Sequence, residues 1–321
     1  MDVTIDQIES YESMTHRHWV ALGNKVGGMG NIKAILRDEL SLELKEVFRK
    51  LFDKNGRFIP FPGLKSAFCD LGSQYSFHQP EIDYGVILRR IRHYLSVGLQ
   101  VKAEKLVLPT AEEFEERVAG PKGIRAKLEA DPRTATALKG IWLPIALPQL
   151  VVPSRKKGGY GVLLEQFVSG AADAYQEAYP GRTFTNYRQG TLAGKVEIIP
   201  GTRHERLIEA MAKGPVVGIV LLPFGGYSIN ACRETFGGHE LSGQIPDYML
   251  LGGGLDTAVA YMAYAKELCR DNNTPIVRCP ALKWQSDSLY FYAYDSNASF
   301  AGTGNLTDAD GSYSAPVFCL G

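Results

Sequence analysis

The chain has 321 residues, of which 45% are hydrophobic, and its 35 Lys and Arg residues balance its 35 Asp and Glu residues to a formal net charge of zero. That length favours one large domain or two ordinary ones. The charge balance argues against nucleic acid as a partner, because a nucleic-acid surface needs a basic excess. Five cysteines without any Cys-x-x-Cys pair argue against a disulfide framework and a structural zinc site.

The N-terminus carries acidic residues before the first long apolar stretch and lacks the basic start of a signal peptide. The longest apolar runs, Ile141 to Val152 and Pro215 to Phe224, are too short and too interrupted by proline to cross a bilayer. The sequence therefore predicts a soluble, cytoplasmic protein that does not have a membrane as a partner.

Residues 1–140 are predicted to form a mostly helical N-terminal part. Helical patterns cover 4–23, 31–40 and the stretch from a Ser41 cap, where apolar residues recur at helical spacing. The clearest helix of this part runs from Glu81 to Val97, with an apolar stripe along one side. Shorter helices are expected at Ala111 to Val118, Pro121 to Ala130 and Pro132 to Leu138.

Residues 141–321 are predicted to form an α/β part, in which strands alternate with helices. We expect strands at Lys195 to Ile199, Val216 to Leu222, Tyr248 to Leu251 and Ile276 to Cys279, and helices at Val162 to Tyr179, Arg203 to Lys213, Ser228 to Phe236 and Thr257 to Arg270. A Thr202-x-x-Glu205 capping box is expected to start the second of these helices. The fold class is α+β or α/β: a helical N-terminal part followed by a mixed, largely parallel sheet flanked by helices.

The last regular element is expected at Ser288 to Tyr294, where four aromatic residues fall within five positions. Such a segment is typical of an edge strand, and edge strands pair readily with another chain. Asp295 to Gly321 is rich in Gly, Ser, Asn and Ala and is predicted to be an irregular C-terminal tail.

A glycine loop supplies the main candidate binding site. After the apolar run Met249 to Leu251 come Gly252, Gly253 and Gly254, and Asp256 and Thr257 then open a helix. A strand followed by glycines and a helix start is typical of an anion site, because backbone N–H groups and the positive helix end face the ligand. Glycines let the backbone approach a phosphate closely.

The segment Gly252-Gly253-Gly254-Leu255-Asp256-Thr257 resembles the pyrophosphate loop of the ATP pyrophosphatase and argininosuccinate synthase families, Ser-Gly-Gly-x-Asp-Ser/Thr. The resemblance implies pyrophosphate-binding roles for Gly253, Gly254, Asp256 and Thr257. It covers six residues, Gly252 stands where the family has Ser, and only about 64 residues follow Thr257. The alternative therefore stays open that Asp256 or Thr257 caps a helix and the glycines form a tight turn.

Two further loops are candidates to complete such a ligand site. The segment Phe224 to Tyr227 contains Gly225 and Gly226, and Gly237 to His239 adds an imidazole. If the strands Val216 to Leu222 and Tyr248 to Leu251 run parallel, the first loop emerges at the same sheet edge as the glycine loop.

The sequence contains no complete catalytic constellation. The one candidate nucleophile-base pair is Cys232 with His204 or His239. The alternative is that Cys232 is a small buried residue with a structural role. No His-x-x-x-His or Cys-x-x-Cys pair supports a metal, and no motif identifies a cofactor.

Two functional hypotheses remain. The first is a non-catalytic interaction or scaffold protein with a protein partner or a homo-oligomeric state. The alternative is a small-molecule or phosphate-binding enzyme that holds an anionic ligand at residues 252–257.

Overall fold

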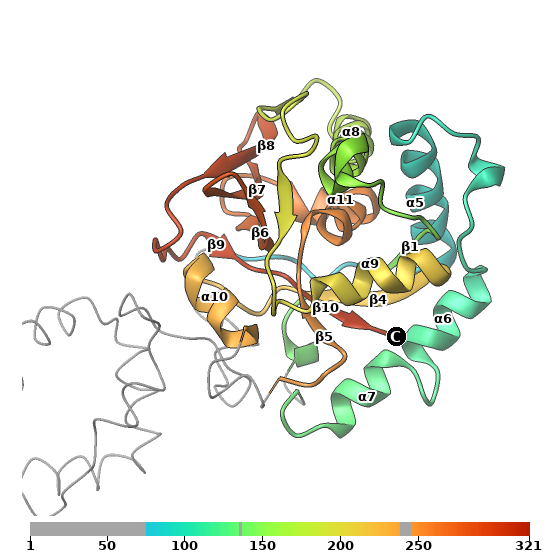
Figure 1. Ribbon diagram of the computed structural model, residues 1–321. Coiled ribbons are helices and arrows are strands. Elements are labelled where there is room, and N and C mark those ends of the chain that lie inside the picture. Colours follow the sequence, from blue (N-terminus) through green and yellow to red (C-terminus); the bar gives the residue numbers. More distant parts are fainter. Residues whose placement is uncertain (1–74, 135–136, 238–244) are drawn as a thin grey trace, which may run out of the picture. The chain divides into compact units, whose positions relative to one another are not determined.

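The computed structural model describes residues 75–134, 137–237 and 245–321 (Figure 1). The chain divides into two compact units, Met1–Phe58 and Ile59–Gly321, and the fold below is that of the second unit. The helices expected before residue 75 lie outside the described residues, and so does His239.

The described helices follow the predicted ones closely, except at Pro132 to Leu138. The helix predicted there is wrong for the described residues, because 132–134 form a turn and only a short 3₁₀ segment follows. The described helices are α5 (Tyr84–Gly98), α6 (Ala111–Ala119), α7 (Ile124–Ala130), α8 (Gly159–Ala178), α9 (His204–Lys213), α10 (Ile229–Phe236) and α11 (Gly254–Leu268), with short 3₁₀ turns η2 (Ala103–Lys105), η3 (Ala137–Lys139) and η4 (Arg155–Lys157). Local capping explains several starts. The Asp83 side chain accepts from the Val86 amide at 2.8 Å at the start of α5, and Thr110 and Glu113 form a reciprocal capping box at α6. No described helix is long and apolar enough to cross a membrane.

A four-stranded sheet has the order β1-β4-β10-β5. Its strands are β1 (Trp142–Leu147), β4 (Val216–Leu221), β10 (Val317–Leu320) and β5 (Met249–Leu251), and every neighbouring pair is antiparallel. The central strand β4 is buried along its whole length, as its uninterrupted apolar sequence predicts.

A second, six-stranded sheet has the order β2-β8-β7-β6-β3, with β9 paired to β6. Its strands are β2 (Thr183–Asn186), β8 (Asn297–Thr303), β7 (Asp287–Ala293), β6 (Ile276–Trp284), β3 (Val196–Ile198) and β9 (Tyr313–Ser314). Strands β6, β7 and β8 follow one another as hairpins, and the first turn contains Gln285 in the left-handed region at φ 56°.

The prediction of a largely parallel sheet is wrong. Six of the eight described strand pairs are antiparallel, and only β2–β8 and β6–β9 are parallel. The prediction assumed that strands joined through helices become neighbours. Instead, the last strand of the chain lies between β4 and β5, and short hairpins join β6, β7 and β8, which makes these pairs antiparallel.

Residues 295–321, for which the sequence predicts an irregular tail, contain the strands β8, β9 and β10. Strand β7 is also not at an edge, because β6 and β8 flank it, and the edges of this sheet are β2, β3 and β9. The weak strand propensity of the Gly- and Ser-rich C-terminus is overridden by pairing with partners that are distant in sequence.

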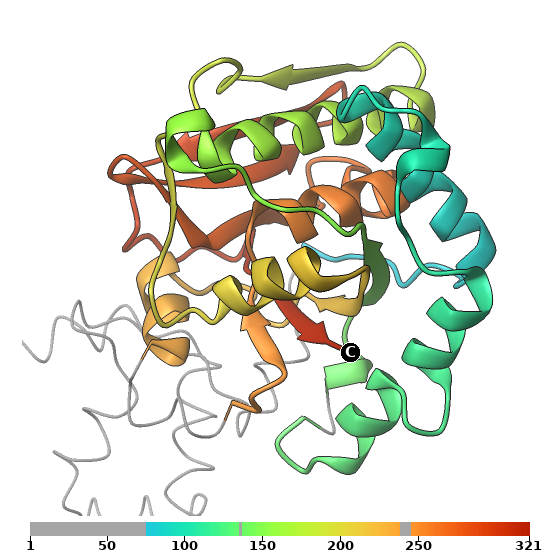
Figure 2. The ribbon, with the colours of Figure 1, turned by 45° about the vertical axis from the view of Figure 1, so that its right-hand side comes forward.

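Helix α11 forms the centre of the unit between the two sheets (Figures 1 and 2). It contacts α8 and α5, Tyr261 stacks on Phe291 of β7 at 4.5 Å between ring centroids, and the Tyr264 hydroxyl donates to the Pro144 carbonyl of β1 at 2.7 Å. The helix is kinked at Tyr264, and Arg90 of α5 donates to the Ala263 carbonyl at the kink, at 3.0 Å. A helix that is apolar on all sides is expected to be buried in this way.

Candidate functional site

The glycine loop lies at the carboxyl end of β5, and residues 252–257 are buried throughout. A Cβ added to Gly252 would lie under 3.0 Å from Pro316, one added to Gly253 under 3.0 Å from the His204 ring, and one added to Gly254 under 3.0 Å from Leu164. These glycines are therefore required by the close approach of other parts of the protein.

The backbone groups at the start of α11 are hydrogen-bonded to the protein's own side chains. The Asp256 carboxylate accepts from the Gly253 amide at 3.0 and 3.2 Å, and the Thr257 hydroxyl donates to the Gly253 carbonyl at 2.5 Å. This geometry confirms the interpretation of Asp256 as a helix cap. The sequence suggests the Gly253 amide as a donor to a bound anion, but in the structure this amide already donates to Asp256.

The next two amides of α11 are bonded to Tyr160, which no pattern in the sequence indicates. The Tyr160 hydroxyl accepts from the Gly254 amide at 3.2 Å and from the Leu255 amide at 3.1 Å. It lies 3.0 Å from Nε2 of His204. Because a hydroxyl has one proton and two acceptor sites, Tyr160 donates to His204, whose Nε2 is the acceptor. The sequence carries no signal of this contact, because Tyr160 lies 94 residues from Gly254.

His204 is the first residue of α9 and is completely buried. The predicted capping box does not form: the Thr202 hydroxyl donates to the Ile199 carbonyl at 2.7 Å, and Arg203 at the N-cap has φ 64°. This left-handed residue turns the chain so that His204 points inward. Within the described part of the chain, Nδ1 of His204 has no hydrogen-bond partner.

Burial dominates the electrostatics of this network. It lowers the pKa of His204, and the nearby carboxylates of Asp256 and Glu205 oppose that shift. Burial likewise raises the pKa of Asp256, and it raises the pKa values of the Tyr160 hydroxyl and the Cys279 thiol well above their ordinary values. His204 is therefore neutral at neutral pH, and neither the tyrosine nor the cysteine is activated as a nucleophile.

We expect the free energy of unfolding of the wild type, relative to His204→Gln, to fall as the pH falls from 7.5 to 5.5. The folded state resists protonation of His204, so the unfolded state binds more protons below its pKa near 6.5. The slope cannot exceed about 1.4 kcal/mol per pH unit for one proton. Urea unfolding at several pH values measures it. Glutamine keeps a hydrogen-bond acceptor for the Tyr160 hydroxyl. The raised pKa of Asp256 changes stability with pH in the opposite direction, but Asp256 is present in both proteins. Parallel pH profiles would contradict the expectation.

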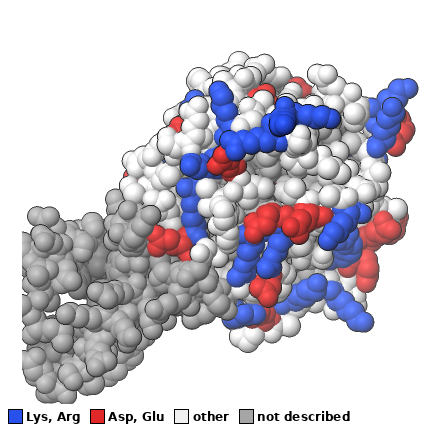
Figure 3. All heavy atoms as spheres, viewed as in Figure 1, with Lys and Arg blue, Asp and Glu red and all other residues white. Residues whose placement is uncertain are grey.

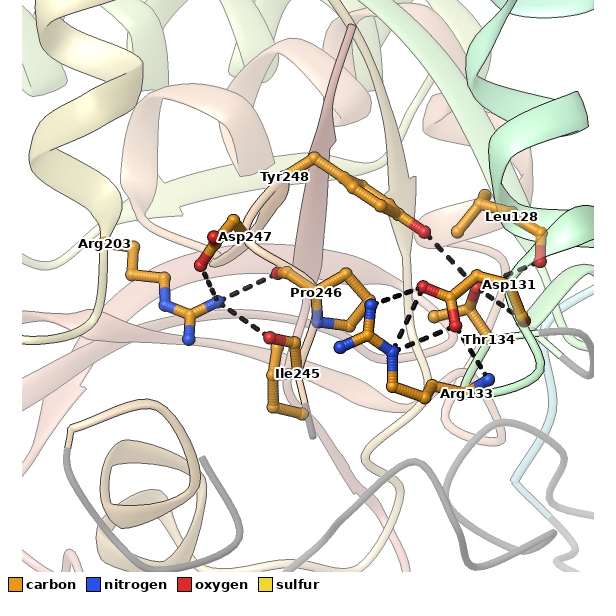
Figure 4. A network of polar contacts seen from close by, with 9 residues as sticks. All are labelled: Leu128, Asp131, Arg133, Thr134, Arg203, Ile245, Pro246, Asp247 and Tyr248. Carbon is orange, nitrogen blue, oxygen red and sulfur yellow. Dashed lines mark hydrogen bonds and ion pairs between the residues drawn. The ribbon is translucent and has the colours of Figure 1, made fainter. Parts of the chain in front are cut away.

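Residues 245–248, which lead into β5, are held in place at both ends by side-chain contacts (Figure 4). Arg203 donates from Nη1 to the carbonyls of Ile245 at 3.2 Å and Pro246 at 2.8 Å. The Tyr248 hydroxyl lies 3.3 Å from that of Thr134, which follows α7 and donates to Leu128. These contacts place β5, and with it the glycine loop, against the ends of α9 and α7.

Gly225 and Gly226 lie at the same sheet edge as the glycine loop. Strands β4 and β5 run in the same direction because both are antiparallel to β10, which separates them. The Gly226 amide donates to Tyr313 at 2.8 Å, and the Gly252 amide donates to Pro316 at 2.8 Å. Gly225 lines a pocket of about 240 Å³ that the glycine loop does not reach. The structure therefore brings these two groups of predicted residues to one edge but not into one site.

The aromatic residues of β7 form a separate surface. Tyr290 and Tyr292 alternate with buried Leu289 and Phe291, so their rings lie on the sheet face that points away from α11. Their ring centroids are 5.6 Å apart, and that of Tyr292 is 5.0 Å from Tyr294, whose side chain is 53% exposed. On the same face, Arg278 is paired with Tyr290, and Ser299 with Tyr292. We call these residues, with Asn297 of β8, the tyrosine face.

The described residues contain no group of three or more metal-ligating side chains. The four described cysteines are buried, and Cys232 in α10 is completely buried. His204 is bonded to Tyr160, so it is not placed as the base of a Cys232 nucleophile. In comparisons with known proteins, no family model, no curated protein and no solved structure matches this chain.

Proposed function

We propose that this chain is a non-catalytic interaction protein and that the tyrosine face is its binding surface. The observation that carries the proposal is the row of partly exposed rings of Tyr290, Tyr292 and Tyr294 on one sheet face. Tyrosine and arginine are enriched at protein interfaces, because a tyrosine offers a large apolar area and one hydroxyl at low entropic cost.

Hydrogen-bonding groups without partners gather on the same face. Within the described residues, Nε and Nη1 of Arg278, Oγ of Ser299 and Oδ1 of Asn297 are buried and have no hydrogen-bond partner. Arg278 is 4% exposed and stacks over the Tyr313 ring at 3.5 Å. Buried polar atoms without partners are rare and call for an explanation. A partner that shifts the covering side chains would have to offer acceptors to the Arg278 guanidinium and a donor to Oδ1 of Asn297.

We infer that the first partner is a second copy of the chain. A tyrosine hydroxyl both donates and accepts, and its ring is apolar, so a two-fold axis can place the face against itself. The formal net charge is zero, and Figure 3 shows basic and acidic side chains interspersed on the viewed face, so two copies do not carry a strong net repulsion.

Pairing through a sheet edge is less favoured by the geometry. The edge strands of the six-stranded sheet are β2, β3 and β9, which have four, three and two residues. Short edge strands are a common protection against pairing with other chains. The broad face therefore offers a larger contact than any of these edge strands. We place no ligand at residues 252–257, because the amides of Gly253, Gly254 and Leu255 are bonded to Asp256 and Tyr160.

Sedimentation equilibrium of the full chain tests the proposal. We expect reversible dimerisation at or below about 100 µM, and a Tyr292→Ala, Tyr294→Ala double variant should weaken it about tenfold or more, because central interface tyrosines contribute over 1 kcal/mol each. The control Val151→Ser removes a side chain that is 73% exposed elsewhere and should associate like the wild type. A wild type that stays monomeric, or a double variant that associates equally well, would contradict the tyrosine face as the interface.

A further inference from the structure

A pocket of about 150 Å³ is lined by residues of three neighbouring helices, α5, α8 and α11 (Figure 1). Beside it the helices are in close contact: a Cβ added to Gly170 of α8 would lie under 3.0 Å from the Tyr94 carbonyl of α5 and from Met262 of α11. Further along α8, the short side chains of Ala174 and Ala178 leave the space that forms the pocket. A cavity of about 150 Å³ is large enough for a molecule the size of benzene.

Charged side chains of both signs line this pocket. They are Arg90 of α5, Glu177 of α8 and Lys266 of α11, and all three residues are exposed to solvent. A ligand can therefore reach them from the solvent. The Lys266 side chain forms no hydrogen bond or ion pair within the described part of the chain, so its ammonium group is available to an anionic group of a ligand.

The Arg90 guanidinium is held at the pocket wall. Its Nη1 donates to the Ala263 carbonyl at 3.0 Å, beside the kink of α11 at Tyr264. A guanidinium carries several N–H groups in one plane, so this single bond orients the group and leaves other donors for a ligand. A carboxylate matches such a planar donor, because it can accept two parallel hydrogen bonds. Arg90 and Lys266 therefore favour a carboxylate at this side of the pocket.

Glu177 supplies the opposite charge. Burial, together with the hydrogen bond to the Glu177 carboxylate, raises the pKa of Tyr94 to about 12, so the Tyr94 hydroxyl keeps its proton and donates. A carboxylate has two oxygens with several acceptor sites, and this bond leaves others for a ligand. Glu177 and Ala178 are the last two residues of α8, and the negative end of a helix also favours a cation. This side of the pocket therefore favours an ammonium group.

The rest of the wall is apolar and consists of Met262, Ala174, Ala178, Ala263 and Ala265. We propose that this pocket binds a small zwitterion, namely a free α-amino acid with a short apolar side chain. Its carboxylate lies toward Arg90 and Lys266, and its ammonium group lies toward Glu177. A simple anion would be repelled by the carboxylate of Glu177, and a simple cation by the other two side chains, so a zwitterion matches all three charges. The proposal does not depend on the tyrosine face as an interface.

Titration of the full chain, followed by its amide NMR shifts at neutral pH and low salt, tests the class of ligand. The probes L-valine, 3-methylbutanoate and 2-methylpropylamine share a branched carbon chain and carry both charges, only the negative charge and only the positive charge. We expect L-valine to bind saturably with a Kd on the order of 1 mM, and each analogue to bind about fivefold more weakly. Saturable binding of L-alanine or L-leucine in place of L-valine also supports the class. No saturable binding of any of the three amino acids at about 20 mM, or an analogue that binds as tightly as L-valine, would overturn the proposal.

Matched variants locate the site. Lys266→Gln and Glu177→Gln each remove one charge from the pocket and should each weaken amino-acid binding about fivefold, whereas Lys266→Arg should bind nearly like the wild type. Lys266→Gln should leave the melting temperature unchanged, because its ammonium group has no partner among the described residues. The control Lys156→Gln removes the same charge from the exposed η4 turn and should leave binding unchanged. The amide shifts should concentrate at residues 174–178 and 262–266. Shifts elsewhere, or binding that neither glutamine variant in the pocket weakens, would overturn the proposal.

Discussion

Tyr160→Phe should lower the free energy of unfolding by about 4 kcal/mol, although it removes a single oxygen atom. Three buried groups lose their partner at once: the amides of Gly254 and Leu255 and Nε2 of His204. Each buried group left without a hydrogen bond costs about 1–3 kcal/mol. The ring itself remains, so the packing against its neighbours changes little. Urea unfolding at pH 7.5, monitored by circular dichroism, measures the difference.

Tyr179→Phe is the matched control for this substitution. The Tyr179 hydroxyl donates to the Lys266 carbonyl at 2.8 Å at a site open to solvent, where water replaces the lost partner. We expect a loss of less than about 1 kcal/mol. Equal losses of unfolding free energy in the two variants would show that the hydrogen bonds of the Tyr160 hydroxyl do not stabilise the start of α11 more than an exposed hydrogen bond does.

Gly218→Ala should lower the free energy of unfolding by about 3 kcal/mol. Gly218 lies within the buried central strand β4, and an added Cβ would lie under 3.0 Å from ring atoms of Phe318 on β10. Overpacking a dense core typically costs 1–3 kcal/mol, and here the ring is buried and flanked by strands on both sides. Thermal and urea unfolding both measure the loss.

The partner substitution Phe318→Leu tests the reason for that loss. It opens space at the same contact, so Gly218→Ala should cost less in the Phe318→Leu background than in the wild type, with a coupling of about 1 kcal/mol or more. Gly214→Ala provides the control, because nothing lies within 4 Å of its added Cβ and its backbone is extended. Strictly additive effects of the two substitutions would contradict the placement of β10 beside β4.

Many local elements could be predicted from residue patterns alone. The apolar stripe within Glu81 to Val97 predicts α5, and the uninterrupted apolar run from Val216 predicts the buried strand β4. These elements depend on spacing and capping within a few residues, and such signals are local. The helix-cap interpretation of Asp256 belongs to the same class, since the side chain bonds an amide only three residues away.

The site could be predicted only in part. Sequence order places the glycine loop between a strand and a helix, as the structure shows. It does not show that Tyr160 bonds the amides of Gly254 and Leu255 and that His204 packs against Gly253. Both side chains come from elements distant in sequence. The tyrosines of β7 were identified as a group, but their place within the sheet was not, because it depends on β8.

The sequence by itself determined the order and approximate bounds of the described helices, the strand β4 and the strand-glycine-helix junction after β5. Only the tertiary structure decided the direction of the strand pairs, because the C-terminal strand β10 lies between β4 and β5 and turns an expected parallel pair into two antiparallel ones. Residues 317–320 form a short strand whose position is specified by long-range partners. A small glycine on β4 makes room for Phe318, and Val317 pairs with both Leu221 and Leu251. Long-range pairing of this kind leaves no periodic signal in the chain.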